Sequence, residues 1–251
     1  MKLHMLGVNG PFPASGGATS GYLLEAEGRV LGFDFGSGVL SRLTAVYPPE
    51  ELDALFLSHW HFDHTCDLLP LIYRLESAGK HLTVYGPEDS ASAIRKIVSQ
   101  ASCFTLEEVR PGDVISFAAP APEGEKAAAA SPVTVRVGPA RHPVPGVGFL
   151  VRAEGRSFGY TGDTNTLPEL KDFYRGCDLL LADGLFPGED WGEQKPHLSA
   201  ALAAELARDA GARRLVLTHL NPVYDPARLL AEARPLFRET ALAEAGRVLT
   251  L

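Results

Sequence analysis

Residues 59–64 read His59-Trp60-His61-Phe62-Asp63-His64, so three histidines and one aspartate lie within six positions. On an extended segment His59 and His61 point to the same side, because side chains alternate with a period of two. Asp63 and His64 follow where the chain starts a helix, and they can face a neighbouring point. Imidazole and carboxylate ligands suit Zn²⁺, Mn²⁺ or Fe, so this segment can supply two metal positions. The plainer alternative, a polar loop with Asp63 as a helix cap, is disfavoured by four ligand-type residues among six.

The segments flanking this motif predict where it lies in the fold. Leu52–Ser58 is a β-like run that ends at His59. From Asp63 onward the pattern is helical, with four apolar residues on one face: Leu68, Leu69, Ile72 and Leu75. The motif is therefore predicted on a strand-to-helix connection, where side chains can converge.

The rest of the chain mixes short strands and helices, which indicates an α/β protein. The other predicted strands are Lys2–Val8, Gly21–Glu25, Val30–Asp34, Leu82–Tyr85, Val114–Phe117, Val133–Val137, Gly148–Ala153, Ser157–Thr161, Leu179–Ala182, Leu215–Thr218 and Val248–Leu251. The other predicted helices are Gly38–Tyr47, Asp89–Gln100, Ser199–Ala210 and Pro226–Leu236. Neither an internal repeat nor a linker interrupts the pattern, so we expect a single domain over residues 1–251.

Two segments stand apart from this regular pattern. Ala119–Pro132 is low in complexity and is predicted to be an exposed loop. Phe186–Pro196 is irregular but carries aromatic and charged residues. It fits a functional loop and an ordinary connection equally well.

The composition and charge of the chain limit its expected cellular location and its expected binding partners. No apolar run is long enough to cross a bilayer, and the N-terminus lacks a signal-peptide pattern, so a cytoplasmic location is expected. The net charge of −8 provides no basic field for capturing nucleic acid. It leaves a phosphate substrate open, because bound divalent metals would reverse the field locally. Three widely spaced cysteines indicate reduced thiols rather than a disulfide framework.

Three further metal-ligand candidates lie at predicted strand ends. His219 follows Leu215–Thr218, and Asp163 follows a strand and the turn residue Gly162. His142 precedes another strand, within Ala140-Arg141-His142-Pro143. Each alone fits a structural residue, but together with the motif they supply the number of ligands that two metals require.

These residues resemble the metallo-β-lactamase superfamily, and the resemblance covers nearly the whole chain. The HxHxDH motif, a later single histidine, Gly162-Asp163-Thr164 and a final Thr218-His219 occur in that family's order. Two early stretches, 19–24 and 31–36, are similar to its first strands and the turn after them. The resemblance implies an αββα sandwich, in which two mixed β-sheets pack face to face with helices on the outer faces and metals at one edge.

The resemblance also implies a role for each ligand candidate. It implies two divalent metal ions, most often Zn²⁺, with Mn²⁺ or Fe as alternatives, which share a hydroxide nucleophile. The resemblance assigns His59, His61 and His142 to the first metal. It assigns Asp63, His64 and His219 to the second metal, with Asp163 bridging both. In the family the residue at the position of Asp63 also orients the hydroxide, so Asp63 is predicted to be catalytic. The site keeps a net positive charge, which suits an anionic transition state.

The context of His142 separates branches of this superfamily. Lactamases and glyoxalases usually carry Gly-His-Thr or Gly-His-Ser there, whereas residues 141–149 resemble the phosphodiesterase branch that includes ribonuclease Z. Lactamases also commonly have a cysteine at the position of Asp163. Lys195-Pro196-His197-Leu198-Ser199 resembles the ribonuclease Z segment that protonates the leaving group, so His197 is predicted to be catalytic. A helix-start residue near Ser199 is the plainer alternative for His197.

Two departures from ribonuclease Z point to a small substrate. Residues 143–162 are too few for the long arm that grips tRNA, and the acidic net charge fits such a grip poorly. The chain also lacks the cysteine cluster of the related cyclic-phosphate diesterase. We therefore expect a metal-dependent phosphodiesterase acting on a small phosphodiester or nucleotide-like substrate, without membrane contact and as a homodimer. The alternatives are a ribonuclease Z-like tRNA 3′-processing nuclease, a glyoxalase II-like thioester hydrolase and a non-catalytic member of the family.

Overall fold

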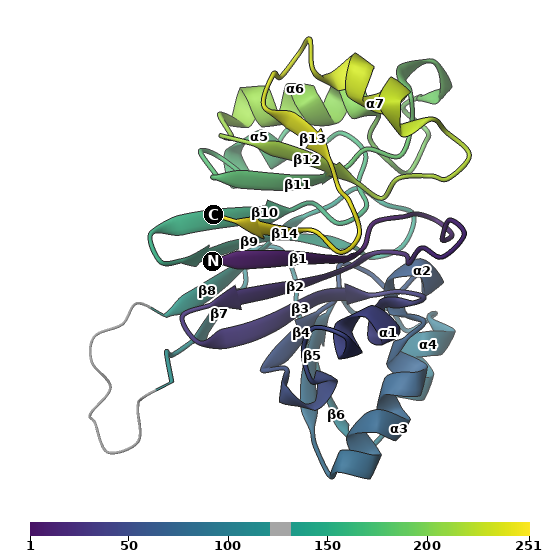
Figure 1. The fold of residues 1–251 in the computed structure, drawn as a ribbon, viewed down its shortest axis with the longest axis vertical. Coiled ribbons are helices and arrows are strands. Elements are labelled where there is room, and N and C mark those ends of the chain that lie inside the picture. Colours follow the sequence, from purple (N-terminus) through teal and green to yellow (C-terminus); the bar gives the residue numbers. More distant parts are fainter. Residues whose placement is uncertain (121–131) are drawn as a thin grey trace.

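The computed structural model describes residues 1–120 and 132–251. Two seven-stranded sheets pack face to face, in the orders β14-β1-β2-β3-β4-β5-β6 and β13-β12-β11-β10-β9-β8-β7. Figure 1 shows helices α1–α4 outside the first sheet and helices α5–α7 outside the second. The predicted αββα sandwich is therefore confirmed.

The first sheet combines antiparallel and parallel strands. Its strands β1 and β2 pair antiparallel with their neighbours, whereas β3 to β6 run parallel. The strands are β1 (Lys2–Gly7), β2 (Gly21–Ala26), β3 (Arg29–Phe35), β4 (Ala54–Phe56), β5 (Leu82–Gly86), β6 (Phe104–Glu108) and β14 (Val248–Thr250). Its helices are α1 (Val39–Thr44), α2 (Phe62–Thr65), α3 (Leu68–Ala78) and α4 (Ala93–Val98), with a 3₁₀ turn at Pro49–Glu51.

The second sheet is also mixed, with β10 to β13 parallel and β7 to β10 antiparallel. Its strands are β7 (Val114–Phe117), β8 (Val133–Pro139), β9 (Val147–Ala153), β10 (Arg156–Tyr160), β11 (Leu179–Asp183), β12 (Leu215–Thr218) and β13 (Thr240–Leu242). Its helices are α5 (Leu170–Phe173), α6 (Ala200–Ala210) and α7 (Pro226–Ala233), with a 3₁₀ turn at Gly188–Asp190.

The apolar core forms three layers, because both faces of each sheet are covered. The middle layer lies between the sheets, where the rings of Phe33 and Phe149 are 5.6 Å apart and those of Phe56 and Phe149 are 5.5 Å apart. Residues two apart on β3, such as Leu31 and Phe33, point into this layer, whereas Val30 packs under the helices. This rigid sandwich fixes the positions of the loops at the strand ends.

Four segments with site candidates follow strand ends. The motif at 59–64 follows β4, His142 follows β8, Asp163 follows β10 and His219 follows β12. Tyr160 of β10 pairs with Leu181 of β11, which pairs with Val216 of β12, so the three carboxyl ends lie together. Ligand sites commonly form at the carboxyl ends of parallel strands.

Most predicted elements are present, with shifted ends. Asp89–Gln100 shortens to α4, Pro226–Leu236 ends at Ala233, and the helix expected after Asp63 is broken into α2 and α3. Among the described residues, two strands and one α-helix were not predicted: β6, β13 and α5. Strand β6 lies at a sheet edge and exposes Thr105, Glu107 and Glu108, so it lacks a strong apolar signal.

Two other sequence expectations concern loops and membranes. The loop predicted at Ala119–Pro132 lies almost entirely outside the described residues. Within the described ranges, the structure contains no helix of the length and apolarity required to span a membrane.

Candidate metal centre

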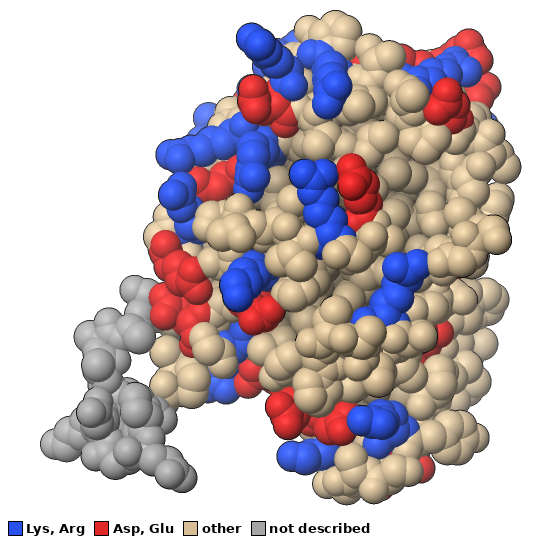
Figure 2. Space-filling view, in the orientation of Figure 1, with Lys and Arg blue, Asp and Glu red and all other residues tan. Residues whose placement is uncertain are grey.

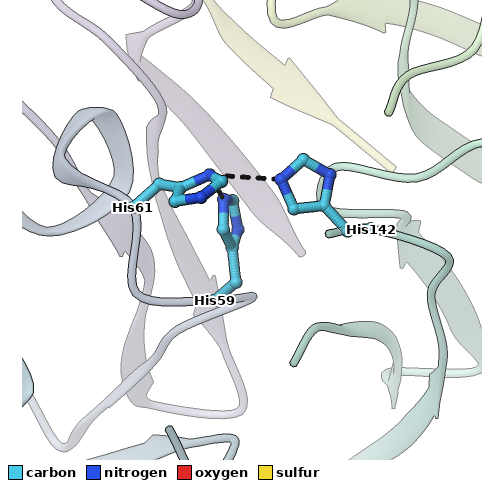
Figure 3. Close-up of side chains that lie close together, drawn as sticks. All are labelled: His59, His61 and His142. Carbon is cyan, nitrogen blue, oxygen red and sulfur yellow. Dashed lines mark hydrogen bonds between the residues drawn. The ribbon is translucent and has the colours of Figure 1, made fainter. Parts of the chain in front are cut away.

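The first group of candidate ligands consists of three histidine rings that converge (Figure 3). His59 Nε2 lies 3.0 Å from His61 Nδ1, and His142 Nε2 lies 3.1 Å from the same atom. Nitrogen atoms bound tetrahedrally to zinc at about 2.0–2.1 Å lie roughly 3.3 Å apart. Two of the three nitrogen–nitrogen distances are therefore close to the spacing that one metal ion imposes.

The second group consists of Asp63, His64, Asp163 and His219. Asp163 Oδ2 lies 3.2 Å from His64 Nε2 and 3.4 Å from His219 Nε2. Asp63 Oδ2 lies 3.5 Å and 3.7 Å from the same two nitrogen atoms. Asp163 Oδ2 is also 3.6 Å from His59 Nε2, so this oxygen contacts both groups.

Several buried polar atoms of the second group lack hydrogen-bond partners, which indicates whether a cation fits there. Within the described residues, four buried atoms of this group have no hydrogen-bond partner: Asp63 Oδ2, His64 Nε2, Asp163 Oδ1 and His219 Nε2. An unsatisfied buried polar atom costs about 1–3 kcal/mol, so four in one place need an explanation. Burial, assisted by Asp163, raises the pKa of the Asp63 carboxyl to about 6 although His64 opposes the rise. A divalent cation would satisfy these atoms and stabilise the carboxylate charge.

Hydrogen bonds to the ring nitrogens that face away from the centre orient three of the histidines. The Ser58 hydroxyl donates to Asp34 at 2.8 Å, so its oxygen can accept from His59 Nδ1 at 3.0 Å. His142 Nδ1 donates to the Pro196 carbonyl at 3.2 Å. Ser20 Oγ lies 3.1 Å from His219 Nδ1. Such partners fix the tautomer in metal sites and leave Nε2 free for the metal.

Asp34 is a buried organising residue that sequence reasoning missed. It is the next-to-last residue of β3 and has a φ of 55°, a left-handed conformation that is uncommon outside glycine. Its carboxylate accepts from His64 Nδ1 at 2.7 Å, from the Ser58 amide at 2.7 Å and from the Tyr160 hydroxyl at 2.5 Å. The available signal was a carboxylate inside the apolar stretch Leu31–Phe35.

His197 lies against both groups of candidate ligands. Its ring stacks on His219 with centroids 5.0 Å apart, and its centroid is 5.3 Å from that of His142. Its Nδ1 donates to Asp183 Oδ2 at 2.8 Å, while Asp163 Oδ2 is farther away at 3.8 Å. Burial lowers the pKa of His197, but the carboxylates of Asp183 and Asp163 outweigh it and raise the pKa to about 9.

His142, Asp163 and His197 also form an overlapping potential ligand group. Because Nδ1 of His197 donates to Asp183, Nε2 is the ring nitrogen that stays available. Asp183 ends the apolar strand β11, and sequence reasoning missed it. A carboxylate at the end of that strand was the available signal.

Two glycines permit the close approach of these segments. A Cβ at Gly10 would lie 2.0 Å from the His219 ring. A Cβ at Gly162, whose φ is +58°, would lie 2.6 Å from Ser58 Cβ. A larger residue at either position would displace a neighbour of the candidate metal centre.

The Phe186–Pro196 segment contacts this site. The Asn165 side chain donates to the Lys195 carbonyl at 2.5 Å, and Arg141 donates to the Glu193 carbonyl at 2.9 Å. The Trp191 indole donates to the His197 carbonyl at 3.1 Å. The segment therefore helps to position His197 and, through Pro196, His142.

The fold and the site together define a metallo-hydrolase of the β-lactamase superfamily. A family model described as "Beta-lactamase superfamily domain" matches residues 19–220, and the chain belongs to this family. As the resemblance predicted, its relatives include proteins named ribonuclease Z.

Three proteins are similar to this chain over nearly its whole length. The "Probable metallo-hydrolase YhfI" of Bacillus subtilis is 30% identical and the match covers 99% of both chains. Its crystal structure has a TM-score of 0.87, with 29% identity over 99% of this chain and 98% of that one. Ribonuclease Z of Methanosarcina acetivorans is 27% identical over 97% of this chain and 96% of the relative. Human tRNase Z, short form, shares the fold with a TM-score of 0.76 at 21% identity, covering 100% of this chain and 99% of that one.

Proposed function

We propose that this protein is a binuclear metallo-phosphodiesterase acting on a small phosphodiester or nucleotide-like substrate. The observation that carries the proposal is His197, which lies between the two ligand groups with its Nδ1 committed to Asp183. A histidine held in this way beside a metal centre fits a proton donor for an alkoxide leaving group.

The ligand assignment follows the two side-chain groups. His59, His61 and His142 would hold one ion, and Asp63, His64 and His219 the other, with Asp163 shared. Zn²⁺ is the metal we favour, with Mn²⁺ or Fe as alternatives, because imidazole and carboxylate ligands suit all three. Bound divalent metals would supply Lewis acidity and an activated water. Asp63 would orient that water through its carboxylate.

The proton donor follows from the hydrogen bonding of His197. Its Nδ1 donates to Asp183, so Nε2 is the nitrogen that can face a substrate oxygen. The same carboxylate favours the protonated ring, with the pKa raised to about 9, which suits an acid at neutral pH. Asp183 would act as a positioning residue, since it touches His197 rather than the reacting atoms.

The surroundings of the centre favour a small substrate over a long polyanion. A cavity of about 700 Å³ beside His142 is lined by four prolines and by Glu88, Glu108 and Arg110. Two acidic residues and one basic residue give this cavity no excess of positive charge to hold a nucleic-acid backbone. The alignment with the Methanosarcina ribonuclease Z spans 293 positions, more than the 251 residues of this chain, so that relative contains segments absent here.

Apolar side chains on the segments that carry ligands also favour a base-bearing or aromatic substrate. Phe62 lies within the ligand motif and is 63% exposed, and Val223, four residues after His219, is 67% exposed. Phe12, two residues after Gly10, is 46% exposed. Aromatic and apolar surfaces next to a phosphate-binding centre suit a nucleobase or aryl group.

A ribonuclease Z-like nuclease is the second candidate, because several relatives carry that name.

We also propose that residues 1–251 form one catalytic unit that works as a homodimer. Size-exclusion chromatography with light scattering tests the dimer. The cytoplasmic location stays a prediction from the sequence.

We expect metal-loaded protein to hydrolyse bis(p-nitrophenyl) phosphate in preference to a cephalosporin lactam or an acyl-glutathione thioester. The carboxylate Asp163 and the proton donor His197 are the reasons. Initial rates on the three substrates at equal concentration test this expectation. Faster turnover of the lactam or the thioester would assign the protein to another branch of activity.

A further inference from the structure

A cavity of about 420 Å³ opens between the edge strands of the two sheets, away from the candidate metal centre. Strands β13 and β14 border it, and the chain between them crosses from one sheet to the other. In that crossing the Met5 amide donates to the Arg247 carbonyl at 2.9 Å, and the Gly246 amide donates to the Met5 carbonyl at 2.7 Å. The cavity therefore has walls fixed by both sheets.

Four arginines from separate parts of the chain line this cavity: Arg214, Arg234, Arg238 and Arg247. Only two acidic residues, Glu239 and Glu244, lie among the lining residues. This local excess of positive charge contrasts with the net charge of −8 for the whole chain. Figure 2 shows Lys and Arg side chains gathered over the upper left of this face, where the ends of β11 and β12 and helix α6 lie in Figure 1.

The guanidinium groups retain donors for a ligand. Arg214 donates to the Thr250 carbonyl at 3.2 Å and Arg234 to the Thr240 carbonyl at 3.2 Å, so each is anchored by a neutral acceptor. A guanidinium carries five N–H donors, so most donors of both residues stay free for a ligand. Within the described chain, Arg247 pairs with the exposed Glu244 at 3.2 Å, and Arg238 has no ion pair.

The floor of the cavity is apolar. Met5, Val216, Ala241 and Leu249 belong to the layer between the sheets or pack against it. Guanidinium groups above an apolar floor suit a ligand with a phosphate at one end and a flat organic part at the other. Val216 lies three residues before His219, so about 10 Å of chain separates this cavity from the metal centre along β12.

We propose that this cavity is a second ligand site, which binds a small organic phosphate of nucleotide size. Its volume lies within the range of small-molecule sites, and a duplex or a long strand would not fit inside it. The proposal does not depend on the activity of the metal centre. The arginines would recognise a phosphate on a free nucleotide and a phosphate at the end of an RNA strand in the same way. The experiment below distinguishes these two ligands.

Calorimetric titration of metal-loaded protein with adenosine monophosphate tests the proposal. The pocket variant is Arg238→Glu with Arg247→Glu, because neither side chain anchors a backbone carbonyl in the structure. The matched control is Arg175→Glu with Arg208→Glu, two exposed arginines paired with nearby aspartates outside the cavity. Metal content should be equal in all three proteins, so binding at the metal centre is a constant background.

The wild type and the control should show a binding component that the pocket variant weakens by on the order of 100-fold. Glu239→Gln should strengthen that component by about two- to fivefold, because it removes a rim charge of the wrong sign. Identical isotherms for the wild type and the pocket variant would overturn the site. The proposal of a small ligand would be overturned by a short oligoadenylate that binds the wild type far more tightly than adenosine monophosphate does and loses that affinity in the pocket variant.

Discussion

Replacing Asp163 with asparagine is expected to lower phosphodiester hydrolysis by more than about 100-fold and to reduce the bound metal by at least one equivalent. Loss of an outer partner of a metal ligand alone costs about 10–100-fold in affinity or activity. Asp163 Oδ2 contacts both ligand groups, so its loss should exceed that range. An amide keeps the shape of the side chain but removes the negative charge that two dications require.

The control for this variant is Asp53→Asn. Asp53 also accepts hydrogen bonds, from Arg29 at 2.6 Å and the Val30 amide at 2.7 Å, but it lies outside the candidate centre. We expect the control to keep its metal and its rate. If Asp163→Asn also kept full metal content and a rate within about twofold of the wild type, the shared-ligand role of Asp163 would be wrong.

The second large effect concerns His197→Ala and depends on the leaving group. An alkoxide departs slowly unless its oxygen is protonated, and a positioned acid contributes roughly 10²–10⁴-fold. Nitrophenolate is stable enough to depart unprotonated. We therefore expect a loss of that size on a dinucleotide or alkyl phosphodiester and a much smaller loss on bis(p-nitrophenyl) phosphate. Steady-state rates on both substrate types, together with metal content, measure this contrast.

Asp183→Asn provides the matched test of how His197 is held. The amide keeps one hydrogen-bond acceptor for Nδ1 but removes the charge that favours the protonated ring. This variant should therefore show the same leaving-group contrast in weaker form, with a lower pKa on the basic limb of the pH–rate profile. Equal losses on both substrate types, or a loss of metal in His197→Ala, would assign His197 to a structural or ligand role.

The sequence predicts the metal motif because its signal is local. The spacing of His59, His61, Asp63 and His64 indicates metal ligands within six consecutive residues, without knowledge of the tertiary fold. The other candidates, His142, Asp163 and His219, were recognised by their order along the chain, and the structure brings all seven residues together. The mixed sandwich followed from the same resemblance, whereas the mixture of strands and helices along the chain indicated only an α/β protein.

Asp34 and Asp183 could not be assigned from the sequence alone, because their roles depend on tertiary contacts. Asp34 receives hydrogen bonds from His64 and Tyr160, which are 30 and 126 residues away along the chain. The short edge strand β13 was missed for a related reason. Three residues, Thr240–Leu242, carry too little periodicity to predict a strand before its partner β12 is known.

The central claim is that one chain holds two divalent metal ions, and metal stoichiometry tests it most directly. The protein is stripped with a chelator, reconstituted with Zn²⁺ or Mn²⁺, freed of excess metal and measured by elemental analysis against amino-acid analysis. We expect two equivalents per chain, and one or none for Asp163→Asn measured in parallel. A wild-type value that stays at one equivalent or below after reconstitution with either metal would contradict the binuclear centre.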